Sequence, residues 1–396
     1  MEYILLILLI IIAIKFNQSK FVTLLMLFLI VIIFGLNNHH TKEIVNYDFY
    51  NYNIWFQIPG NQPITGFSNE PLFRKLIELF KRMNFNITHL RLFIALFGML
   101  LLSYSIKKFT NRIAAVLALY LIFPFINDVI QIRNFLSYAI VIYSFTLYFK
   151  FNGTKKIVIP LILVVISGLI HQSSYIYILF LIMLCFSIPT LKKTVVIVFL
   201  MGIFLIYSGI FQMIISLISD NFKIDYYTSR ITYEGAIIVI GTLLLIYFTM
   251  HLVYHRLKTD KNYFGNTEKG KFVDFVYKLN LISLGIGFLW LLDFNFIRLY
   301  RNIFIFNYIV FIYYLFEYKA KNNYETILKP AIFLHILFLC ALFHLSDFNL
   351  YVKPAISDNY FFDAIRMLFS LSGNNIIDID LYVMKYRYIE RMIKYV

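Results

Sequence analysis

The chain has 396 residues, of which 61% are hydrophobic and 14% are charged, and its formal net charge is +15. Soluble domains carry about twice that share of charged residues, so this composition excludes a water-soluble core. The basic residues are spread in ones, twos and threes between apolar runs. That spacing argues against a nucleic-acid partner and favours a role in membrane orientation.

Long uncharged stretches predict helices that cross a membrane. Between Lys156 and Lys192 the sequence has 35 residues without Asp, Glu, Lys or Arg, whereas one spanning helix needs about 20 apolar residues. The apolar runs are continuous and lack the polar and apolar alternation of membrane β-barrels. The predicted fold class is therefore all-α, a polytopic transmembrane helical bundle. The predicted number of spans is about 12, within a range of about 10 to about 14. The predicted spans are residues 3–16, 21–36, 90–106, 113–128, 132–149, 157–171, 174–189, 194–210, 235–254, 275–293, 302–317 and 330–346.

The start of the chain and its cysteines have simple interpretations. Met1 is followed by an apolar run without the basic region and cleavage site of a secretory signal, so we expect a retained first helix. Cys185 and Cys340 both lie inside apolar runs, which argues against a disulfide framework or a cysteine metal site. No nucleotide motif or metal-ligand cluster is found in the sequence, so we expect no cofactor and no metal.

The loops predict how the bundle is oriented. Lys and Arg gather in alternate loops, including the stretch from Arg256 to Lys278, and by the positive-inside rule these loops are cytoplasmic. Residues 1–346 then form a polytopic membrane domain with two long outer loops, 37–89 and 211–234. Residues 347–396 form an extracytoplasmic tail, and both termini are expected outside.

Two outer segments have the pattern of helices that lie in the membrane interface. In the segment from Glu70 to Met83 apolar residues share one stripe and basic residues occupy the remaining surface. The stripe consists of Leu72, Leu76, Leu79 and Phe80. A weaker form of the pattern extends from Tyr360 to Leu371 in the tail. Both segments are expected to lie along the outer membrane surface.

Three arginines at the outer ends of predicted spans are candidates for binding an anion. An arginine at membrane depth costs about 2.5 to 3.5 kcal/mol on the insertion scale, so it usually faces a cavity or a partner. Arg133 opens the span that follows the outer bend at Pro124, and an ion pair with Asp128 is the alternative there. Arg298 and Arg301 lie three residues apart, so on a helix both face one side and suit a pyrophosphate. Binding of ordinary lipid headgroups is the alternative for this pair.

Candidates for proton transfer also lie on the outer side. His171 follows a predicted span, and imidazole can take a proton from a sugar hydroxyl near neutral pH; a purely structural hydrogen bond is the alternative. Asp48 and Glu70 are acids in the first outer loop, and Glu70 could instead cap the helix that Pro71 opens. The neighbours His39 and His40 would point apart on a helix, which argues against a metal site.

The order of these elements resembles the EpsG family of Wzy-like exopolysaccharide polymerases. The resemblance covers about residues 1–185 well and about 290–315 loosely, and the family's early loop often begins with a Gly-Asp-Tyr-like turn where this chain has Asn46-Tyr47-Asp48. The resemblance rests on five short motifs that occur in the same order as in the family, at residues 46–52, 69–73, 131–136, 170–174 and 298–301.

The resemblance implies a metal-independent, Wzy-type glycosyltransferase that polymerises polyprenyl-pyrophosphate-linked oligosaccharide repeats outside the bacterial cytoplasmic membrane, as a multi-pass protein. Arg133, Arg298 and Arg301 would hold the pyrophosphate, and His171, or else Asp48 or Glu70, would take the hydroxyl proton. Two more residues, Asn134 and Tyr300, are expected to bind substrate. Expected partners are the lipid-linked oligosaccharide and membrane lipids, with a chain-length regulator and a flippase as further candidates. The alternatives are a flippase of the lipid-linked repeat and a membrane acyltransferase acting on surface polysaccharide.

Overall fold

The computed structural model describes residues 2–36, 52, 55–56, 70–210, 213, 233–260, 267–292, 296–318 and 323–345. The predictions for His39, His40, Asp48 and the 347–396 tail, and most of the loop 211–234, fall outside these residues and stay predictions.

All regular secondary structure in the described residues is helical, which confirms the all-α fold class. Each of the predicted spans overlaps with helix. Three helical segments of the described residues are long and apolar enough to cross a membrane: Ile87–Phe109, Ile188–Tyr207 and Ile240–Thr259. The number of about 12 spans therefore stays a prediction. The helices are α1 Glu2–Lys15, α2 Lys20–Leu36, α4 Pro71–Arg82, α5 Ile87–Phe109, α6 Ile113–Ile122, α7 Phe125–Ile130, α8 Ile132–Lys150, α9 Lys155–Ile170, η1 Gln172–Tyr175, α10 Ile176–Met183, α11 Ile188–Tyr207, α14 Tyr233–Thr259, α16 Glu268–Gly285, η2 Gly287–Leu291, α17 Ile297–Arg301, α18 Phe304–Ile312, η4 Tyr313–Glu317 and α19 Asn323–Leu345.

Several predicted spans are interrupted for a physical reason. The span predicted for 113–128 is two helices, because Pro124 has no backbone N–H and cannot continue the hydrogen-bond ladder of α6. With 10 residues, α6 rises about 15 Å, which is half of a hydrocarbon core of about 30 Å. The breaks place short segments, such as α7 and α17, at helix ends where polar side chains can meet.

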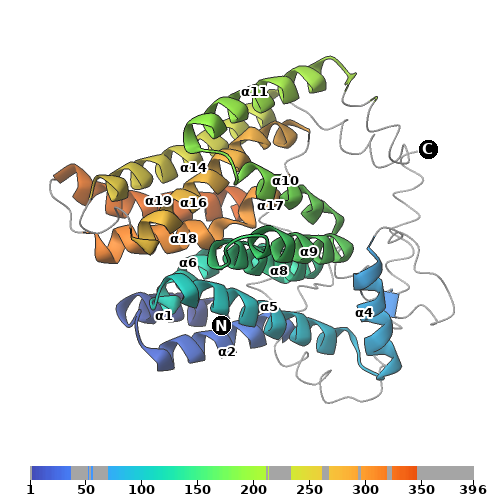
Figure 1. The fold of residues 1–396 in the computed structure, drawn as a ribbon. Coiled ribbons are helices and arrows are strands. Elements are labelled where there is room, and N and C mark those ends of the chain that lie inside the picture. Colours follow the sequence, from blue (N-terminus) through green and yellow to red (C-terminus); the bar gives the residue numbers. More distant parts are fainter. Residues whose placement is uncertain are drawn as a thin grey trace.

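The long helices run side by side, and α4 crosses one end of them (Figure 1). Helix α8 packs against α9 and α5, and α5 packs against α2, while α16 packs against α11 and α14. Small residues permit the closest approaches: a Cβ on Gly98 would lie 2.3 Å from the ring of Phe135, and a Cβ on Gly168 would lie 2.3 Å from the ring of Tyr175. These contacts fix the ends of α8 and α9 that carry the site.

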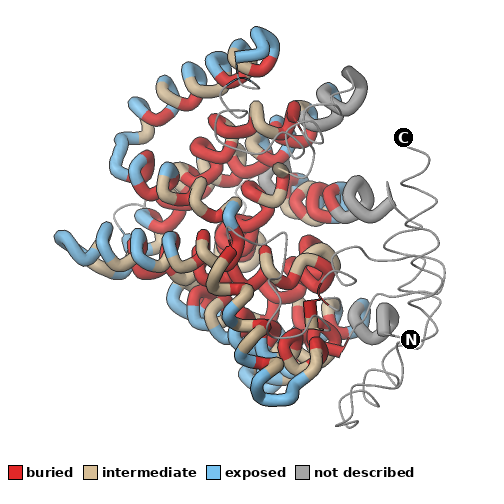
Figure 2. Tube along the Cα trace, turned by 90° about the vertical axis from the view of Figure 1, so that its right-hand side faces the viewer, coloured by how far each residue is buried: buried red, intermediate tan, exposed pale blue. Residues whose placement is uncertain are grey.

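The surface of the outer helices is apolar. Figure 2 shows buried residues in the interior and exposed residues along the outer helices. On α5 the large side chains of Phe93, Leu96, Phe97, Leu100 and Tyr104 are exposed, in a spacing that forms one face of a helix. Since water does not favour such a surface, and patches of this kind mark contact with lipid or partners, the protein is embedded in a membrane.

The basic residues that end α5 and begin α9 lie at the end of the bundle opposite α4, which carries basic residues of its own. Helix α5 begins near α4 and ends at Lys107 and Lys108, and α9 runs back from Lys155 toward α4. At the basic end Glu317 lies 3.9 Å from Arg112 and also pairs with Lys269. The directions of α5 and α9 place Lys107, Lys108 and Lys155 at one end, and the orientation predicted for the whole chain stays a prediction.

The amphipathic helix predicted after Glu70 is present as α4, but its buried face is rotated. Phe73, Ile77 and Phe80 are buried, whereas Leu79 is 51% exposed. Leu79 lies off the row of side chains along which α4 packs on α9 and α5, and the predicted position of α4 along the outer membrane surface stays a prediction. The face that remains outside carries Leu79 together with exposed basic residues.

The close approach of α5 to α8 gives a test of this packing. We expect Gly98→Ala to lower the free energy of unfolding by about 1 to 3 kcal/mol, because the new methyl group overlaps the ring of Phe135. Gly241→Ala, where nothing lies within 4 Å of the added Cβ, is the matched control and should be neutral or slightly stabilising. Thermal unfolding in detergent measures both, and equal midpoints for the two variants would contradict the packing.

Candidate active site at one end of the bundle

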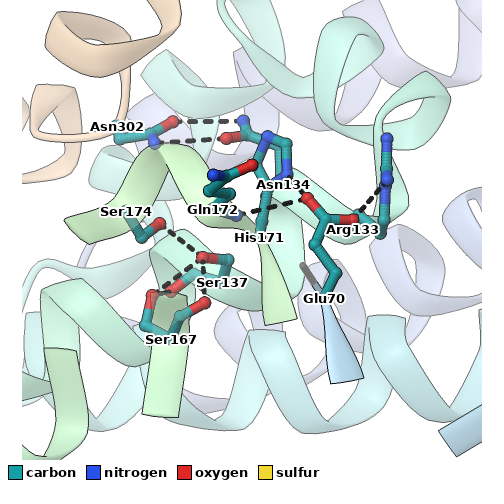
Figure 3. A network of polar contacts seen from close by, with 9 residues as sticks. All are labelled: Glu70, Arg133, Asn134, Ser137, Ser167, His171, Gln172, Ser174 and Asn302. Atoms are coloured by element: carbon teal, nitrogen blue, oxygen red, sulfur yellow. Dashed lines mark hydrogen bonds and ion pairs between the residues drawn. The ribbon is translucent and has the colours of Figure 1, made fainter. Parts of the chain in front are cut away.

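Glu70 is the centre of a polar network at the end of the bundle that α4 crosses (Figure 3). Pro71 opens α4 as predicted, but the Glu70 side chain makes no capping hydrogen bond to the helix. Instead, its Oε2 forms an ion pair with Arg133, and its Oε1 lies 2.7 Å from Nδ1 of His171. The backbone N–H of Gln172 also donates to Oε1, at 3.2 Å. Glu70 occupies the N-cap position of α4, as the alternative reading expected, but its carboxylate bonds to α8 and to the turn after α9 and not to the helix that it begins.

Three separate elements bring these side chains together. Glu70 precedes α4, Arg133 lies in the first turn of α8, and His171 is the residue at which α9 ends. Arg133 also lies over the rings of Tyr52 and Trp55, 5.9 and 5.8 Å from their centroids, an arrangement in which a guanidinium is attracted to the aromatic faces. An aromatic contact on one side and a carboxylate on the other hold Arg133 in place.

The carboxylate of Glu70 is ionised despite its burial. Burial raises its pKa, but the hydrogen bond from His171, the charge of Arg133 and the N–H of Gln172 lower it by more. The net pKa lies below the ordinary value for a glutamate. An ionised carboxylate can only accept hydrogen bonds, so the Nδ1 of His171 must carry the proton and donate it to Glu70.

The other ring nitrogen of His171 is free to act as a base. His171 is 8% exposed, and its Nε2 has no hydrogen-bond partner among the described residues. Burial lowers the pKa of His171, the bond to Glu70 raises it, and the charges of Arg133 and Arg298 lower it, so that the net pKa is about 4. The imidazole is thus neutral near pH 7, with a lone pair on Nε2.

A cluster of serine hydroxyls holds the turn that carries His171. The Oγ of Ser137 in α8 lies 2.7 Å from Oγ and 3.0 Å from the carbonyl of Ser167 in α9, and it also contacts Oγ of Ser174 in η1. In return, Oγ of Ser167 donates to the carbonyl of Ser137 at 2.9 Å. These bonds tie both sides of the turn to α8, so they fix the position of the imidazole.

The two late arginines have different environments. Arg301 is buried, with its Nη2 3.5 Å from Oδ1 of Asp128 and 2.9 Å from Oε1 of Gln131. Asp128 also accepts hydrogen bonds from two buried tyrosine hydroxyls, Tyr120 at 2.9 Å and Tyr138 at 3.0 Å. The alternative pairing of Arg133 with Asp128 is therefore wrong, since Asp128 pairs with Arg301.

Among Arg133, Arg298 and Arg301, Arg298 is the one whose charge is not compensated by a carboxylate of the described residues. It is half-buried and has no hydrogen bond or ion pair there, and its Nε is buried without a partner. Its charge nevertheless acts on the pKa of His171. Helix α17 is held beside the site because Tyr177 donates to the carbonyl of Leu299 at 2.7 Å.

The comparison with known protein families agrees with this arrangement. The model of the EpsG family matches residues 40–362, which is most of the chain. The chain belongs to the EpsG family. EpsG is a Wzy-like polymerase family, so the chain is related to exopolysaccharide polymerases of membranes. No curated protein and no solved structure matches the chain.

Two residues of the EpsG-like motifs have their polar groups occupied inside the bundle. The amide of Asn134 exchanges hydrogen bonds with that of Asn302, at 3.3 and 3.4 Å (Figure 3). The hydroxyl of Tyr300 donates to Asn280 in α16. Both side chains are also buried, so a ligand could reach them only if the packing around them opened. The contacts therefore favour a supporting role for Asn134 and Tyr300 over the direct substrate binding predicted for them.

Arg91, a buried cation of this EpsG-family chain, was not singled out from the sequence. Arg91 in α5 is 2% exposed, and its Nη2 donates to the carbonyls of Phe34 at 3.1 Å and Val129 at 3.3 Å. These carbonyls lie in the last turns of α2 and α7, where a cation is favourable. Arg91 thereby holds α7, which carries Asp128. A lone arginine within an apolar run was the signal that could have revealed it.

Within the described residues no three His, Cys, Asp or Glu side chains lie close enough to hold a metal ion. The expectation of a metal-independent reaction stays a prediction.

Two glutamates, one just before α4 and one within it, allow a matched test of the network. We expect Glu70→Gln to lower the free energy of unfolding by about 3 kcal/mol, because the buried guanidinium of Arg133 loses its counterion. Glu78→Gln removes an exposed pair with Arg74 and should cost less than about 1 kcal/mol. Thermal unfolding in detergent measures the unfolding midpoint of each variant. The network would be contradicted if the midpoint of Glu70→Gln were not lower than that of Glu78→Gln.

Proposed function

We propose that the chain polymerises polyprenyl-pyrophosphate-linked oligosaccharide repeat units at the outer face of the bacterial cytoplasmic membrane. A sugar hydroxyl of one lipid-linked repeat attacks the anomeric carbon of a chain carried by another lipid. A glycosidic C–O bond forms, the bond between the anomeric carbon and the diphosphate oxygen breaks, and polyprenyl diphosphate leaves. The hydroxyl proton passes to the protein.

The observation that supports this proposal is the presence of two uncommitted groups at the same end of the bundle, His171 in the Glu70 network and Arg298 in α17, which Tyr177 and Asn134 hold near that network. His171 has a free lone pair on Nε2 and a proton fixed on Nδ1, which is the arrangement of a general base. Arg298 has a guanidinium without a counterion among the described residues, which suits the charge that develops on a departing diphosphate. Glycosyl transfer from a diphosphate requires a base for the hydroxyl proton and a cation for the leaving group.

The remaining charged groups take supporting roles in this mechanism. Glu70 orients His171 and selects its tautomer, in the way that a carboxylate orients the histidine of other catalytic sets. Arg133 is the counterion of Glu70, and Arg301 is that of Asp128. Both arginines add to the positive field at the diphosphate, and Arg298 binds it directly. Asp48 remains a candidate for contact with the glycan.

The position of the network in the bundle supports an outer site. It lies at the end away from the basic residues near Arg112 and Lys269, and the positive-inside rule assigns the basic end to the cytoplasm. The donor and acceptor would therefore be lipid-linked glycans in the outer leaflet. Membrane lipids, a chain-length regulator and a flippase are the further partners of this proposal.

Substitution of the two uncommitted groups tests the proposal in cells. We expect Arg298→Gln and His171→Gln each to reduce polymer formation at least about 100-fold, since each removes a group that acts in the transition state. Arg82→Gln, at an exposed position of α4, is the control and should leave polymer unchanged. The measurement is the length distribution of the surface glycan, with protein amount checked by immunoblot.

The lipid-linked precursors distinguish the proposal from the flippase alternative. A polymerase defect leaves single repeats accumulated on the outer leaflet, where externally added glycosidases reach them. Repeats confined to the cytoplasmic leaflet in the Arg298→Gln strain would contradict the proposal and support a flippase.

A further inference from the structure

We propose that the basic end of the bundle carries a binding site for the headgroup of an anionic phospholipid, formed by Lys192 of α11, His251 of α14 and Tyr277 of α16. The ligand is the phosphodiester of a glycerolipid with one net negative charge. The site lies at the end of the bundle away from Glu70, so this inference goes beyond the proposed function.

Tyr277 is the centre of this cluster. Its side chain is buried, and Tyr254 stacks on its ring with the two centroids 3.9 Å apart. The Nζ of Lys192 lies over the same ring, 5.8 Å from its centroid. Because Tyr254 covers one face, the ammonium lies over the other face, where the ring attracts a cation. The ring of Tyr277 thereby connects the start of α11 with the last turns of α14.

The hydroxyl of Tyr277 fixes the orientation of His251. Its oxygen lies 2.8 Å from Nδ1 of His251 and 3.1 Å from the hydroxyl of Tyr247. His251 is half-buried, and its Nε2 makes no hydrogen bond to the described residues. Both the protonated ring and the tautomer that accepts from Tyr277 carry a proton on Nε2. The cluster therefore offers an N–H donor on the side away from the tyrosine hydroxyls.

The charge of Lys192 is not compensated in this cluster. The carboxylate of Asp274 is committed to α14, since Lys258 lies 3.1 Å from its Oδ2 and Tyr254 donates to its Oδ1 at 3.0 Å. Lys192 is exposed and forms no ion pair within the part of the chain that the structure describes. Lys192 and His251 both contact Tyr277, so one positive charge and one N–H donor are gathered around a single ring. A phosphate group complements both.

Ring contacts place the cluster at the basic end of the bundle. Phe275, two residues before Tyr277, has its ring 6.0 Å from that of Tyr148 near the end of α8. Lys156, at the start of α9, lies 4.7 Å from the centroid of the Tyr148 ring. The positive-inside rule assigns this end to the cytoplasm. The headgroup would therefore belong to a lipid of the inner leaflet.

Exposed apolar side chains continue from the polar cluster along both outer helices. They are Val196 and Leu200 on α11 and Leu244 and Phe248 on α14. Their spacings of three, four, seven or eight residues from Lys192 or His251 place them on the same helix faces as these polar groups. Helices α11 and α14 both pack against α16 (Figure 1). Acyl chains below a bound headgroup would cover these faces, whereas a soluble phosphate would leave them uncovered.

Native mass spectrometry of the purified full-length protein in detergent tests this site. The probes are dioleoylphosphatidylglycerol, which is anionic, and dioleoylphosphatidylcholine, which has the same chains and no net charge. We expect the first phosphatidylglycerol to bind at least about tenfold more tightly than phosphatidylcholine, because one charge-assisted contact is lost with the neutral lipid. Soluble glycerophosphoglycerol, which has the headgroup without chains, should bind at least about 100-fold more weakly than the lipid, since it buries no apolar surface.

Substitutions locate the binding in the cluster. We expect Lys192→Gln to weaken phosphatidylglycerol binding at least about fivefold. His251→Leu should weaken it as well, whereas His251→Gln keeps a donor and should bind more tightly than His251→Leu. Lys107→Gln removes an exposed cation from the end of α5 and is the control, with unchanged affinity. Unfolding midpoints measured without lipid should be the same for all four variants.

The outcomes decide between this site and its alternatives. Equal affinity for the two lipids, or an equal loss in Lys107→Gln and Lys192→Gln, would show general attraction to the basic end and overturn the site. Glycerophosphoglycerol binding as tight as lipid binding would identify a site for free phosphates and overturn the assignment to a lipid. Polymer formation by the His171 and Arg298 variants is measured separately, so failure of the lipid site leaves the proposed function untouched.

Discussion

The structure at this end of the bundle depends on the burial of one carboxylate. An ionised glutamate removed from water must be compensated by cations and hydrogen-bond donors, or its desolvation would outweigh any gain from packing. Glu70 is compensated by Arg133, by the Nδ1 proton of His171 and by the N–H of Gln172. These partners come from α8 and from the turn after α9. The carboxylate therefore ties together three elements that are far apart in the sequence.

The compensation of Glu70 determines what remains available for chemistry. Because its Nδ1 is committed, His171 can only offer Nε2 to a ligand. Because Asp128 is held by two tyrosine hydroxyls, it is placed to neutralise Arg301 and not the neighbouring Arg298. The network thus leaves one lone pair and one positive charge unsatisfied in the described part of the site, and an anionic donor with a sugar at its end would satisfy both.

The sequence was sufficient for the fold class and for most of the residues of interest, but not for their pairing. Glu70, Arg133 and His171 could be singled out because charged or titrating residues at the ends of apolar spans are costly and few. Their partners could not be deduced, since proximity in sequence favoured Asp128 for Arg133, whereas Glu70 lies 63 residues away. Helical spacing placed Arg298 and Arg301 on one face, but it could not show that Asp128 reaches Arg301. Span lengths were overestimated where residues such as Pro124 break a helix. Arg91 was overlooked although a lone arginine in an apolar run carries the same signal.

The central claim is that one uncompensated arginine and one free imidazole nitrogen define the place where a lipid-linked diphosphate binds. A cryo-electron microscopy structure of the protein in lipid nanodiscs, with a short-chain polyprenyl diphosphate sugar, tests it most directly. The account predicts diphosphate density within hydrogen-bond distance of the Arg298 guanidinium, with the sugar beside Nε2 of His171 and the Glu70 network unchanged. Density at the basic end near Arg112 and Lys269, or a guanidinium of Arg298 bound to a carboxylate of the protein, would contradict it.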